Sequence, residues 1–448
     1  MRRLDDIKRM DLTRREFVKK ASFGAGIAML AGSLPVQLSA YAGGSETLKL
    51  ALIGCGGRGS GAASQALRAD EGVKLVAMAD IFRDRLDTSY QNLMQRHANE
   101  SEKIDVPEEH KFVGFDAYKK AIELADVVVL ATPQGFRPIH FEAAIDAGKH
   151  VFMEKPLASD VPGVHKVLEA GRKAKEKNLS VVVGLQRRYE GQYRTIIQKI
   201  HDGEIGKIMC GQIYWNEEGA WMHPRQPQYS ELEYQLRNWF YFNWLSGDLP
   251  IEQHIHNIDV ANWIIGEYPI KAQGMGGREV RTGKEYGDIF DHNFVALTYP
   301  SGAVINSQCR HQPGTFSLVG EEFQGCNGSV SFTWRSGSAI RNSSGNVTYE
   351  HDPSNDLSPY QVEHNELFEA IRSGKPINNA EYGAKSTLSG IMVRMASYSG
   401  KVITWDDAFN STQILMPDRM NWNDTPPTLP DADGYYPIPI PGVTNVLT

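Results

Sequence analysis

Two short segments far apart in the chain carry side chains that can move protons. Lys155 lies in Glu154-Lys155-Pro156, directly after a short apolar stretch. Glu252 and His256 are four residues apart, so on a helix the carboxylate would lie against the imidazole, orient it and raise its basicity. Oxidation of an alcohol by hydride transfer needs a group that polarises the hydroxyl oxygen and a group that accepts its proton. We therefore predict Lys155, His256 and Glu252 as catalytic residues.

A glycine-rich loop predicts the cofactor beside which these residues act. An apolar stretch beginning at Leu48 runs into Gly54-Cys55-Gly56-Gly57-Arg58-Gly59, a G-x-G-x-x-G pattern. In a βαβ unit Gly54 permits the tight turn and Gly56 lets the backbone approach a pyrophosphate. Gly59 lets the next helix pack closely with its amides facing the anion. The loop therefore predicts a dinucleotide site that includes Gly57 and Arg58.

A second apolar stretch, Val73 to Ala79, ends at Asp80, 21 residues past Gly59. An acid at this place accepts hydrogen bonds from a ribose 2′-hydroxyl. Asp80 favours NAD over NADP because a 2′-phosphate would meet a carboxylate, although Arg83 and Arg85 are close enough to weaken that preference. We expect NAD as the cofactor.

The first 185 residues alternate apolar strands with helical stretches, which predicts a Rossmann domain, a doubly wound parallel sheet, over residues 48–185. Ligands of such sheets bind beyond the carboxyl ends of the strands. Predicted strand ends carry Thr132-Pro133 and Glu154-Lys155, so these residues join the predicted cofactor site. Arg187 and Tyr189 follow a strand that ends at Gly184, and we expect them on the nicotinamide side of the cleft, Arg187 toward the cofactor and Tyr189 toward the substrate.

The second half is richer in strands and predicts an α/β domain with a predominantly antiparallel open sheet over residues 186–415, for substrate binding and oligomerisation. Helices from Tyr360 to Arg372 and from Ala380 to Tyr398 are expected to close this sheet. A Pro- and Asp-rich extension, residues 416–448, is expected to wrap over the surface or reach a neighbouring subunit. The predicted strands are Lys207 to Trp215, Ile270 to Met275, Phe294 to Pro300, Ala303 to Arg310 and Ser329 to Trp334.

The segment that carries Glu252 and His256 is predicted to be helical from Leu249 to Ile265. Asp248 can cap this helix, and Pro250 suits its first turn. Asp259 then falls on the same face as Glu252 and His256, which makes it a candidate substrate residue.

An extended conformation of this segment would instead place Glu252, His254 and His256 on one face, where they could hold a divalent metal. The cap and the proline favour the helix. We therefore predict no metal site, and expect His254 to be a supporting or surface histidine.

Between these sites, the run from Tyr214 to Trp244 holds four of the eight tryptophans, interleaved with arginines and amides. Aromatic faces that stack on sugar C–H groups, together with forked donors that reach hydroxyls, are typical of a carbohydrate site. We predict Trp221, Arg225 and Arg237 as substrate residues. A subunit interface, where Trp, Tyr and Arg are also enriched, is the alternative, and both can hold at once.

Residues 1–42 have the features of an exported leader. Arg14-Arg15 precedes an apolar Gly/Ala-rich run, and the segment ends in Ala40-Tyr41-Ala42, a cleavage pattern. This resembles a twin-arginine export signal, which predicts a periplasmic or otherwise exported protein without stable membrane insertion after cleavage. The segment carries eight Lys/Arg and four Asp/Glu, so its removal takes the formal charge from −7 to −11. Such a surface argues against nucleic acid as a partner.

The four cysteines, Cys55, Cys210, Cys309 and Cys326, have no metal-finger spacing. A disulfide between Cys309 and Cys326 is compatible with an oxidising compartment, but their spacing does not establish it.

Together, the glycine loop, Asp80, Ala131-Thr132-Pro133, Glu154-Lys155-Pro156 and the acid four residues before His256 resemble the glucose-fructose oxidoreductase / inositol dehydrogenase / rhizopine catabolism family, Gfo/Idh/MocA. The resemblance implies that Lys155 and His256 are the catalytic pair. The family's aspartate falls on Glu252, and Ser246 and Asp248 replace glycines that usually precede this motif. The resemblance also implies a homodimer or homotetramer in which one face of the second sheet is buried.

These features predict an NAD-dependent oxidoreductase acting on a hydroxyl of a sugar or glycoside, with tightly bound cofactor and no net redox change. A redox-neutral reaction is expected because an exported protein has no pool of NAD with which to exchange. One alternative is an NAD-dependent glycoside hydrolase that works by transient oxidation and elimination. Another is a non-catalytic NAD-containing sugar-binding protein, against which the presence of both Lys155 and His256 argues.

Overall fold

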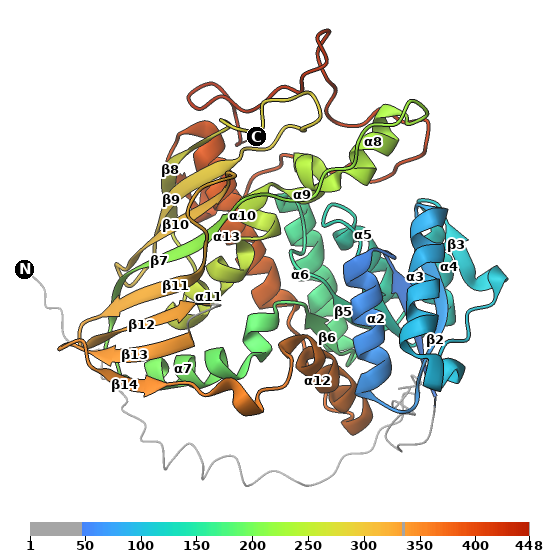
Figure 1. Ribbon diagram of the computed structural model, residues 1–448, viewed down its shortest axis with the longest axis horizontal. Helices are drawn as coiled ribbons and strands as arrows, with labels where there is room; N and C mark the ends of the chain where they lie inside the picture. Colours follow the sequence, from blue (N-terminus) through green and yellow to red (C-terminus); the bar gives the residue numbers. More distant parts are fainter. Residues whose placement is uncertain (1–46, 334–336, 448) are drawn as a thin grey trace, which may run out of the picture. The chain divides into compact units, whose positions relative to one another are not determined.

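The computed structural model describes residues 47–333 and 337–447 (Figure 1). The predicted export segment, residues 1–42, lies outside the described residues. Within the described part of the chain, no helix is both long enough and apolar enough to cross a bilayer.

The described N-terminal residues form a six-stranded, fully parallel sheet in the order β3-β2-β1-β4-β5-β6, the doubly wound sheet that the sequence predicts. Every residue of β4 is buried, as a parallel sheet covered on both faces requires. From β1 the chain adds β2 and β3 on one side, and then returns to add β4, β5 and β6 on the other side. This change of side between β1 and β4 places a crevice at their carboxyl ends. The strands are β1 (Leu48–Ile53), β2 (Val73–Asp80), β3 (Lys111–Val113), β4 (Val127–Leu130), β5 (His150–Met153) and β6 (Val181–Val183).

Alternate residues of β1 point to the two faces of this sheet and enter two different cores. Leu50 and Leu52 pack with α2 (Gly57–Ala69), α3 (Arg83–Arg96) and α12 (Pro359–Ser373). Ala51 and Ile53 pack with the helices of the other face. Those helices are α4 (Ala117–Leu124), α5 (Arg137–Asp146) and α6 (Val161–Glu176).

Helix α12 (Pro359–Ser373) corrects one sequence expectation. It covers the first sheet beside α2, rather than the second sheet, because Leu367, Phe368 and Ile371 belong to the same core as Leu50 and Leu52 (Figure 1). A segment late in the sequence thus completes the cofactor-binding half.

The second sheet has nine strands in the described residues, in the order β14-β13-β12-β11-β7-β10-β9-β8-β15. Within this sheet every pair of neighbouring strands is antiparallel except the pair β7 and β10, which is parallel. This confirms the predominantly antiparallel sheet. Five strands fall where the sequence predicts them, and β11, β13, β14 and β15 are additional. The strands are β7 (Ile208–Glu217), β8 (Lys271–Gly277), β9 (His292–Thr298), β10 (Val304–His311), β11 (Leu318–Gly325), β12 (Gly328–Thr333), β13 (Gly337–Asn342), β14 (Val347–Glu350) and β15 (Ile403–Thr404).

Helix α13 (Ala380–Ser399) lies between the two sheets. It packs against α6 of the Rossmann half and against β8 and β9 of the second sheet. Its last fourteen residues, 386–399, are all buried, which is the pattern of a core helix rather than a surface one. The remaining helical segments are α7 (Gly191–His201), α8 (Glu231–Arg237), η4 (Trp239–Tyr241), α9 (Asn243–Ser246), α10 (Leu249–Glu252), α11 (Ile255–Ile265) and α14 (Trp405–Phe409), with short turns η1 (Ala98–Lys103), η2 (Glu108–His110), η3 (Gln186–Tyr189) and η5 (Pro353–Asn355).

The predicted single helix from Leu249 to Ile265 is therefore wrong in one respect, because it is broken between α10 and α11. Asp248 caps α10 as predicted, and its carboxylate accepts the Leu249 N–H at 2.5 Å. The break falls at Gln253 and His254, where the His254 ring turns toward the second sheet and its Nε2 lies 2.9 Å from Ser307 Oγ on β10.

The C-terminal extension wraps over its own chain. Gln235 on α8 donates a hydrogen bond to the Thr428 carbonyl at 2.8 Å, and the Tyr436 hydroxyl bonds Glu231. The extension lies near α8 and α9 in Figure 1. All four cysteines, each within the described residues, are free, so the Cys309–Cys326 disulfide is not formed in this structure.

Candidate active site

The glycine loop between β1 and α2 has the geometry that a diphosphate needs. Gly54 has φ +93°, and a Cβ there would lie 2.6 Å from the Ala131 carbonyl carbon. A Cβ on Gly59 would lie 1.9 Å from the Gly54 oxygen, so the helix packs against the strand with no room for a side chain. A Cβ on Gly56 or Gly57 would meet nothing within 4 Å. The space above the first turn of α2 is open, and no side chain caps Gly56, so amides there are free to bind an anion.

Asp80, at the end of β2, holds this loop as well as facing the cleft. Its carboxylate accepts the Cys55 N–H at 2.7 Å and the Phe82 N–H at 2.9 Å. Burial raises the pKa of Asp80. Each oxygen thus keeps a lone pair for a ribose hydroxyl while the backbone bonds fix the carboxylate in place.

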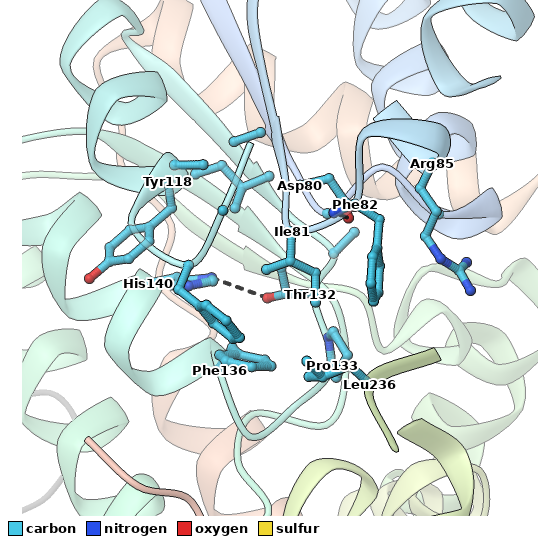
Figure 2. A pocket seen from close by; sticks show the side chains of 18 of the residues that line it. Asp80, Ile81, Phe82, Arg85, Tyr118, Thr132, Pro133, Phe136, His140 and Leu236 are labelled. Atoms are coloured by element: carbon cyan, nitrogen blue, oxygen red, sulfur yellow. Dashed lines mark hydrogen bonds between the residues drawn. The ribbon is translucent and has the colours of Figure 1, made fainter. Parts of the chain in front are cut away.

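Asp80 lines a cavity of about 670 Å³, including space open to solvent, at the carboxyl ends of β1, β2 and β4 (Figure 2). Its walls are mostly apolar and aromatic, which suits the adenosine end of a dinucleotide. Figure 2 shows Thr132 reaching toward His140, whose Nδ1 lies 3.2 Å from the threonine Oγ1. The labelled lining residues are Asp80, Ile81, Phe82, Arg85, Tyr118, Thr132, Pro133, Phe136, His140 and Leu236.

A second cleft, of about 1370 Å³ including space open to solvent, adjoins the first across the glycine loop. Gly56 and Arg85 line both. The second cleft brings together most of the predicted residues, from both halves of the molecule. These are Gly56, Gly57, Arg58, Gly59, Thr132, Pro133, Glu154, Lys155, Trp221, Glu252 and His256.

Lys155 follows β5 and reaches across the cleft to α10. Its Nζ donates to the Glu252 backbone carbonyl at 2.5 Å and to Glu252 Oε1 at 3.3 Å. Both side chains are largely covered, with 15% and 13% of their surfaces exposed. The ion pair fixes the ammonium at the edge of the cleft, where a substrate hydroxyl can reach it.

His256, at the start of α11, is buried with its ring stacked on Trp215 of β7, the centroids 5.9 Å apart. Its Nδ1 has no hydrogen-bond partner among the described residues. Burial, and then the charge of Lys155, holds the pKa of His256 well below its usual value. The imidazole is therefore neutral near pH 7 and can accept a proton.

The expected contact between Glu252 and His256 is absent from the described residues, because the break after α10 removes the one-turn spacing. Glu252 pairs with Lys155 instead. Glu252 and His256 both line the second cleft, but the Glu252 carboxylate contacts Lys155 and not the histidine predicted from the sequence.

Glu154 and Arg58 form an ion-pair network at the glycine loop, in which the carboxylates are buried and 33% of the Arg58 side chain is exposed. The Arg58 guanidinium bonds Glu154 and lies 3.0 Å from Glu363 Oε1 on α12. Burial, and then the charge of Glu154, raises the pKa of Glu363 well above its usual value. Arg58 also lies over the Tyr360 ring at 4.8 Å. The network joins the glycine loop, the end of β5 and α12 in one wall of the second cleft.

Four predicted residues lie elsewhere and correct the sequence interpretation. Arg187 is buried in an ion pair with Glu321 on β11. Asp259 is buried on α11 and accepts two hydrogen bonds from Arg188, at 2.8 and 2.9 Å.

Tyr189 and Arg225 are also engaged away from the two clefts. The buried Tyr189 hydroxyl donates to Asn379 at 2.7 Å, and Arg225 bonds Glu231 and the Tyr436 hydroxyl, both at 2.9 Å. These four side chains join elements of the fold, and the structure gives no support to their contact with cofactor or substrate.

The aromatic run divides between core and cleft. Tyr234, Tyr241 and Trp244 are buried. Trp215, Trp221 and Trp239 line the second cleft. Arg237 lines a third hollow on the outer side of the glycine loop, where it pairs with Asp84.

His254 faces away from this cleft, with its Nε2 against Ser307. Among the described residues, no group of three or more His, Cys, Asp and Glu side chains could hold a metal ion. Glu252, His254 and His256 therefore do not form the metal site of the extended alternative.

Arg85, which the sequence indicated only as a residue close to Asp80, lines all three hollows around the glycine loop. Sequence reasoning missed several other lining residues. Gln134 and Arg137 follow the predicted strand end at Thr132-Pro133. Nothing local in the sequence marks Tyr360, which reaches the cleft only because α12 returns to the Rossmann half.

Comparison with known proteins agrees with this geometry. Residues 48–184 match the oxidoreductase family with NAD-binding Rossmann fold, Gfo/Idh/MocA, and residues 193–322 match the Gfo/Idh/MocA C-terminal domain, together more than half of the chain. A glycosyl hydrolase family 109 protein of Shewanella pealeana is 25% identical over 337 residues, 69% of either chain. An inositol 2-dehydrogenase of Serratia proteamaculans is 34% identical over 165 residues, 36% of this chain and 43% of that protein.

Among solved structures, an aldose-aldose oxidoreductase from Caulobacter crescentus has a TM-score of 0.63 at 20% identity, covering 80% of this chain and all of the other. At this identity the likeness shows the fold. The open cradle at Gly56 and Gly57, with Asp80 beside it, fits the NAD that the family binds. The chain belongs to the Gfo/Idh/MocA family and is an NAD-dependent oxidoreductase.

Proposed function

We propose that this enzyme oxidises a hydroxyl of a sugar or glycoside and returns the reducing equivalents within the same cycle, so that the overall reaction is redox-neutral. The observation that carries the proposal is the convergence of Lys155, Glu252 and His256 in one cleft with three tryptophans beside the glycine loop. The proposed substrate contacts are Trp221, with Trp215 and Trp239 added from the structure.

The two catalytic side chains have separate tasks. The Lys155 ammonium polarises the substrate oxygen, and Glu252 holds it there through the ion pair. The neutral His256 accepts the hydroxyl proton, since its lowered pKa keeps it unprotonated. Bound NAD supplies the hydride acceptor.

A sugar fits the apolar and polar character of this cleft. Trp215, Trp221 and Trp239 offer flat faces for C–H groups, and Gln186 and Gln253 offer amides for hydroxyls. The related inositol dehydrogenase and the structurally similar aldose-aldose oxidoreductase act on polyhydroxylated substrates by name, which supports this class.

The redox-neutral part of the proposal rests on the leader. We propose that residues 1–42 direct export of the folded protein by the twin-arginine route, carrying NAD with it. Outside the cytoplasm no NAD pool is available, so oxidation of one sugar has to be balanced by reduction of a second carbonyl group.

A glycoside hydrolase is the second candidate, favoured by the likeness to the family 109 protein. Transient oxidation of the glycoside at C3 would acidify the C2–H bond. Loss of that proton would let the aglycone leave by elimination, and addition of water and reduction of the C3 carbonyl would complete hydrolysis. The broad cleft suits an extended glycoside as well as a free monosaccharide.

One incubation separates these reactions. Enzyme carrying only its own NAD is mixed with glycosides and with pairs of free sugars in deuterated water. Many turnovers per bound NAD support the redox-neutral proposal, and deuterium at C2 of a released sugar identifies the hydrolase. A requirement for added NAD, with one NADH released per turnover, would contradict both schemes and leave an ordinary dehydrogenase.

We also propose that the enzyme is a homodimer or homotetramer built on the second sheet. One face of that sheet leaves Met209, Met275 and Phe294 exposed, Met275 by 70%. Sedimentation of the purified protein measures the assembly, and a monomer at micromolar concentration would refute this part.

A further inference from the structure

We infer that four side chains from outside the Rossmann half, Leu236, Arg237, Trp239 and Trp422, close the adenosine end of the cleft and hold bound NAD between turnovers. We call these four residues the clasp. This inference rests on the proposed function, because an enzyme that keeps its NAD between turnovers suits a redox-neutral reaction. NAD release is measured without any sugar, however, so the clasp and the reaction can fail separately.

The clasp first supplies part of the cavity wall. Leu236 at the end of α8 and Trp239 in η4 line the adenosine cavity together with Phe82 and Pro133. Figure 2 shows Leu236 beside Pro133 at the edge of the cavity. The cavity for the adenosine end of NAD is thus not made by the Rossmann half alone.

Arg237 joins α8 to the segment that follows β2. Its guanidinium lies 4.0 Å over the ring of Phe82, a residue of the cavity wall, and its Nη1 is 3.1 Å from Asp84 Oδ2. Glu233, one turn earlier on α8, orients the same guanidinium at 2.9 Å. Only 16% of the Arg237 side chain is exposed. These contacts fasten α8 over the loop that an adenosine would have to pass.

Trp422 braces the same wall from the C-terminal extension. Its ring lies 5.6 Å from Phe82 and 5.0 Å from Phe115, centroid to centroid, and both partner rings line the cavity. The extension is held in place before this point, because Asp160 accepts the Leu415 and Met416 N–H groups at 2.8 and 3.2 Å.

One hydrophobic cluster unites these pieces. Phe82 and Phe136 of the Rossmann half pack in it with Leu236 of α8 and with Met416 and Met420 of the extension. Widening the adenosine cavity therefore means separating apolar surfaces that three parts of the chain contribute, and slow release of NAD follows.

The test measures dissociation of radiolabelled NAD from the loaded protein after dilution into excess unlabelled NAD. Trp422→Ala and Arg237→Gln should each speed release by roughly tenfold or more, because each removes an independent contact with Phe82. Trp422→Phe, which keeps a ring in place, should release label at nearly the parent rate.

Tyr435→Ala is the matched control. Tyr435 is an exposed aromatic residue of the same extension and contacts Lys284, away from the cavity. It should leave the release rate unchanged. Thermal unfolding checks that each variant folds, and either of the two test variants is sufficient on its own. Release at the parent rate in a folded test variant would overturn the inference, as would a parent that exchanges its NAD as fast as it is mixed.

Discussion

The two ends of the cofactor cleft are built in different ways. The adenosine end is a cavity of rings, including Phe82, Phe115, Tyr118 and Phe136, with Asp80 as its anchored acid. The reactive end gathers charged side chains from separate elements: Arg58 of α2, Glu154 and Lys155 after β5, and Glu252 of α10. The adenosine end binds through the shape of its apolar walls, whereas the reactive end positions charged side chains. Substitutions at the two ends should therefore separate cofactor binding from turnover.

The largest effect is expected at the reactive end. Lys155→Ala and His256→Ala should each lower turnover by about 100-fold or more, the usual scale for a positioned acid or base, while NAD stays bound. Steady-state rates and the nucleotide content of the purified variants measure the two quantities. Lys173→Ala, in an exposed ion pair with Asp146 at 3.2 Å, is the matched control and should turn over like the parent. Loss of NAD from either active-site variant would contradict the proposal that the two ends separate cofactor binding from turnover.

At the adenosine end, Asp80→Ala should weaken NAD binding by about 1 to 3 kcal/mol, because hydrogen bonds to the ribose and the anchor of the loop are lost. Discrimination against NADP should relax at the same time. Calorimetry with both nucleotides gives the affinities, with Asp146→Ala as the control on the same half. An unchanged affinity and preference would remove Asp80 from the site.

Glu252→Gln should act more weakly, lowering turnover by about five-fold, since the Lys155 ammonium keeps its bond to the Glu252 backbone carbonyl and loses only the charge-assisted one. Its effect should vanish in a Lys155→Ala background, because Glu252 acts through Lys155. The opposite result would be that Glu252→Gln still lowers turnover in a Lys155→Ala background but has no effect in a His256→Ala background. That result would favour the contact between Glu252 and His256 that the sequence predicts.

The smallest effect concerns pH. Because burial and Lys155 lower the pKa of His256, the imidazole stays unprotonated as the pH falls through the ordinary histidine range. The rate of turnover should therefore show no acid limb from His256 between about pH 6 and 7. A limb centred there in the parent and missing from the His256→Ala residual activity would show that the histidine titrates normally.

The sequence predicted what is local, and the adenosine end shows why. Gly54, Gly56 and Gly59 each have the spatial role that their spacing indicates, since a turn, an open approach and a close helix contact all arise within a few residues. Asp80 was predicted from its place at a strand end, and it lines the cavity at the ends of β1, β2 and β4. The parallel sheet followed from continuous apolar strands, and the alternating strands of the second sheet were found in part.

What the sequence missed depends on distant contacts. The break before α11 arises where His254 meets Ser307 on a strand about fifty residues later, and no local signal marks it. The aromatic run was seen, but whether Trp244 enters the core or Trp221 the cleft depends on packing. Arg187 and Asp259 have the right chemistry for a site, yet each is buried in an ion pair with another side chain.

We propose that Lys155 and His256 perform the proton transfer that accompanies hydride transfer to NAD. The most direct measurement is a single turnover: NAD-loaded enzyme is mixed rapidly with a sugar that the parent accepts, and NADH absorbance is followed on the enzyme. We expect fast NADH formation in the parent and a rate at least about 100-fold lower in Lys155→Ala and His256→Ala with full NAD occupancy. NADH formation at the parent rate in either occupied variant would contradict the account.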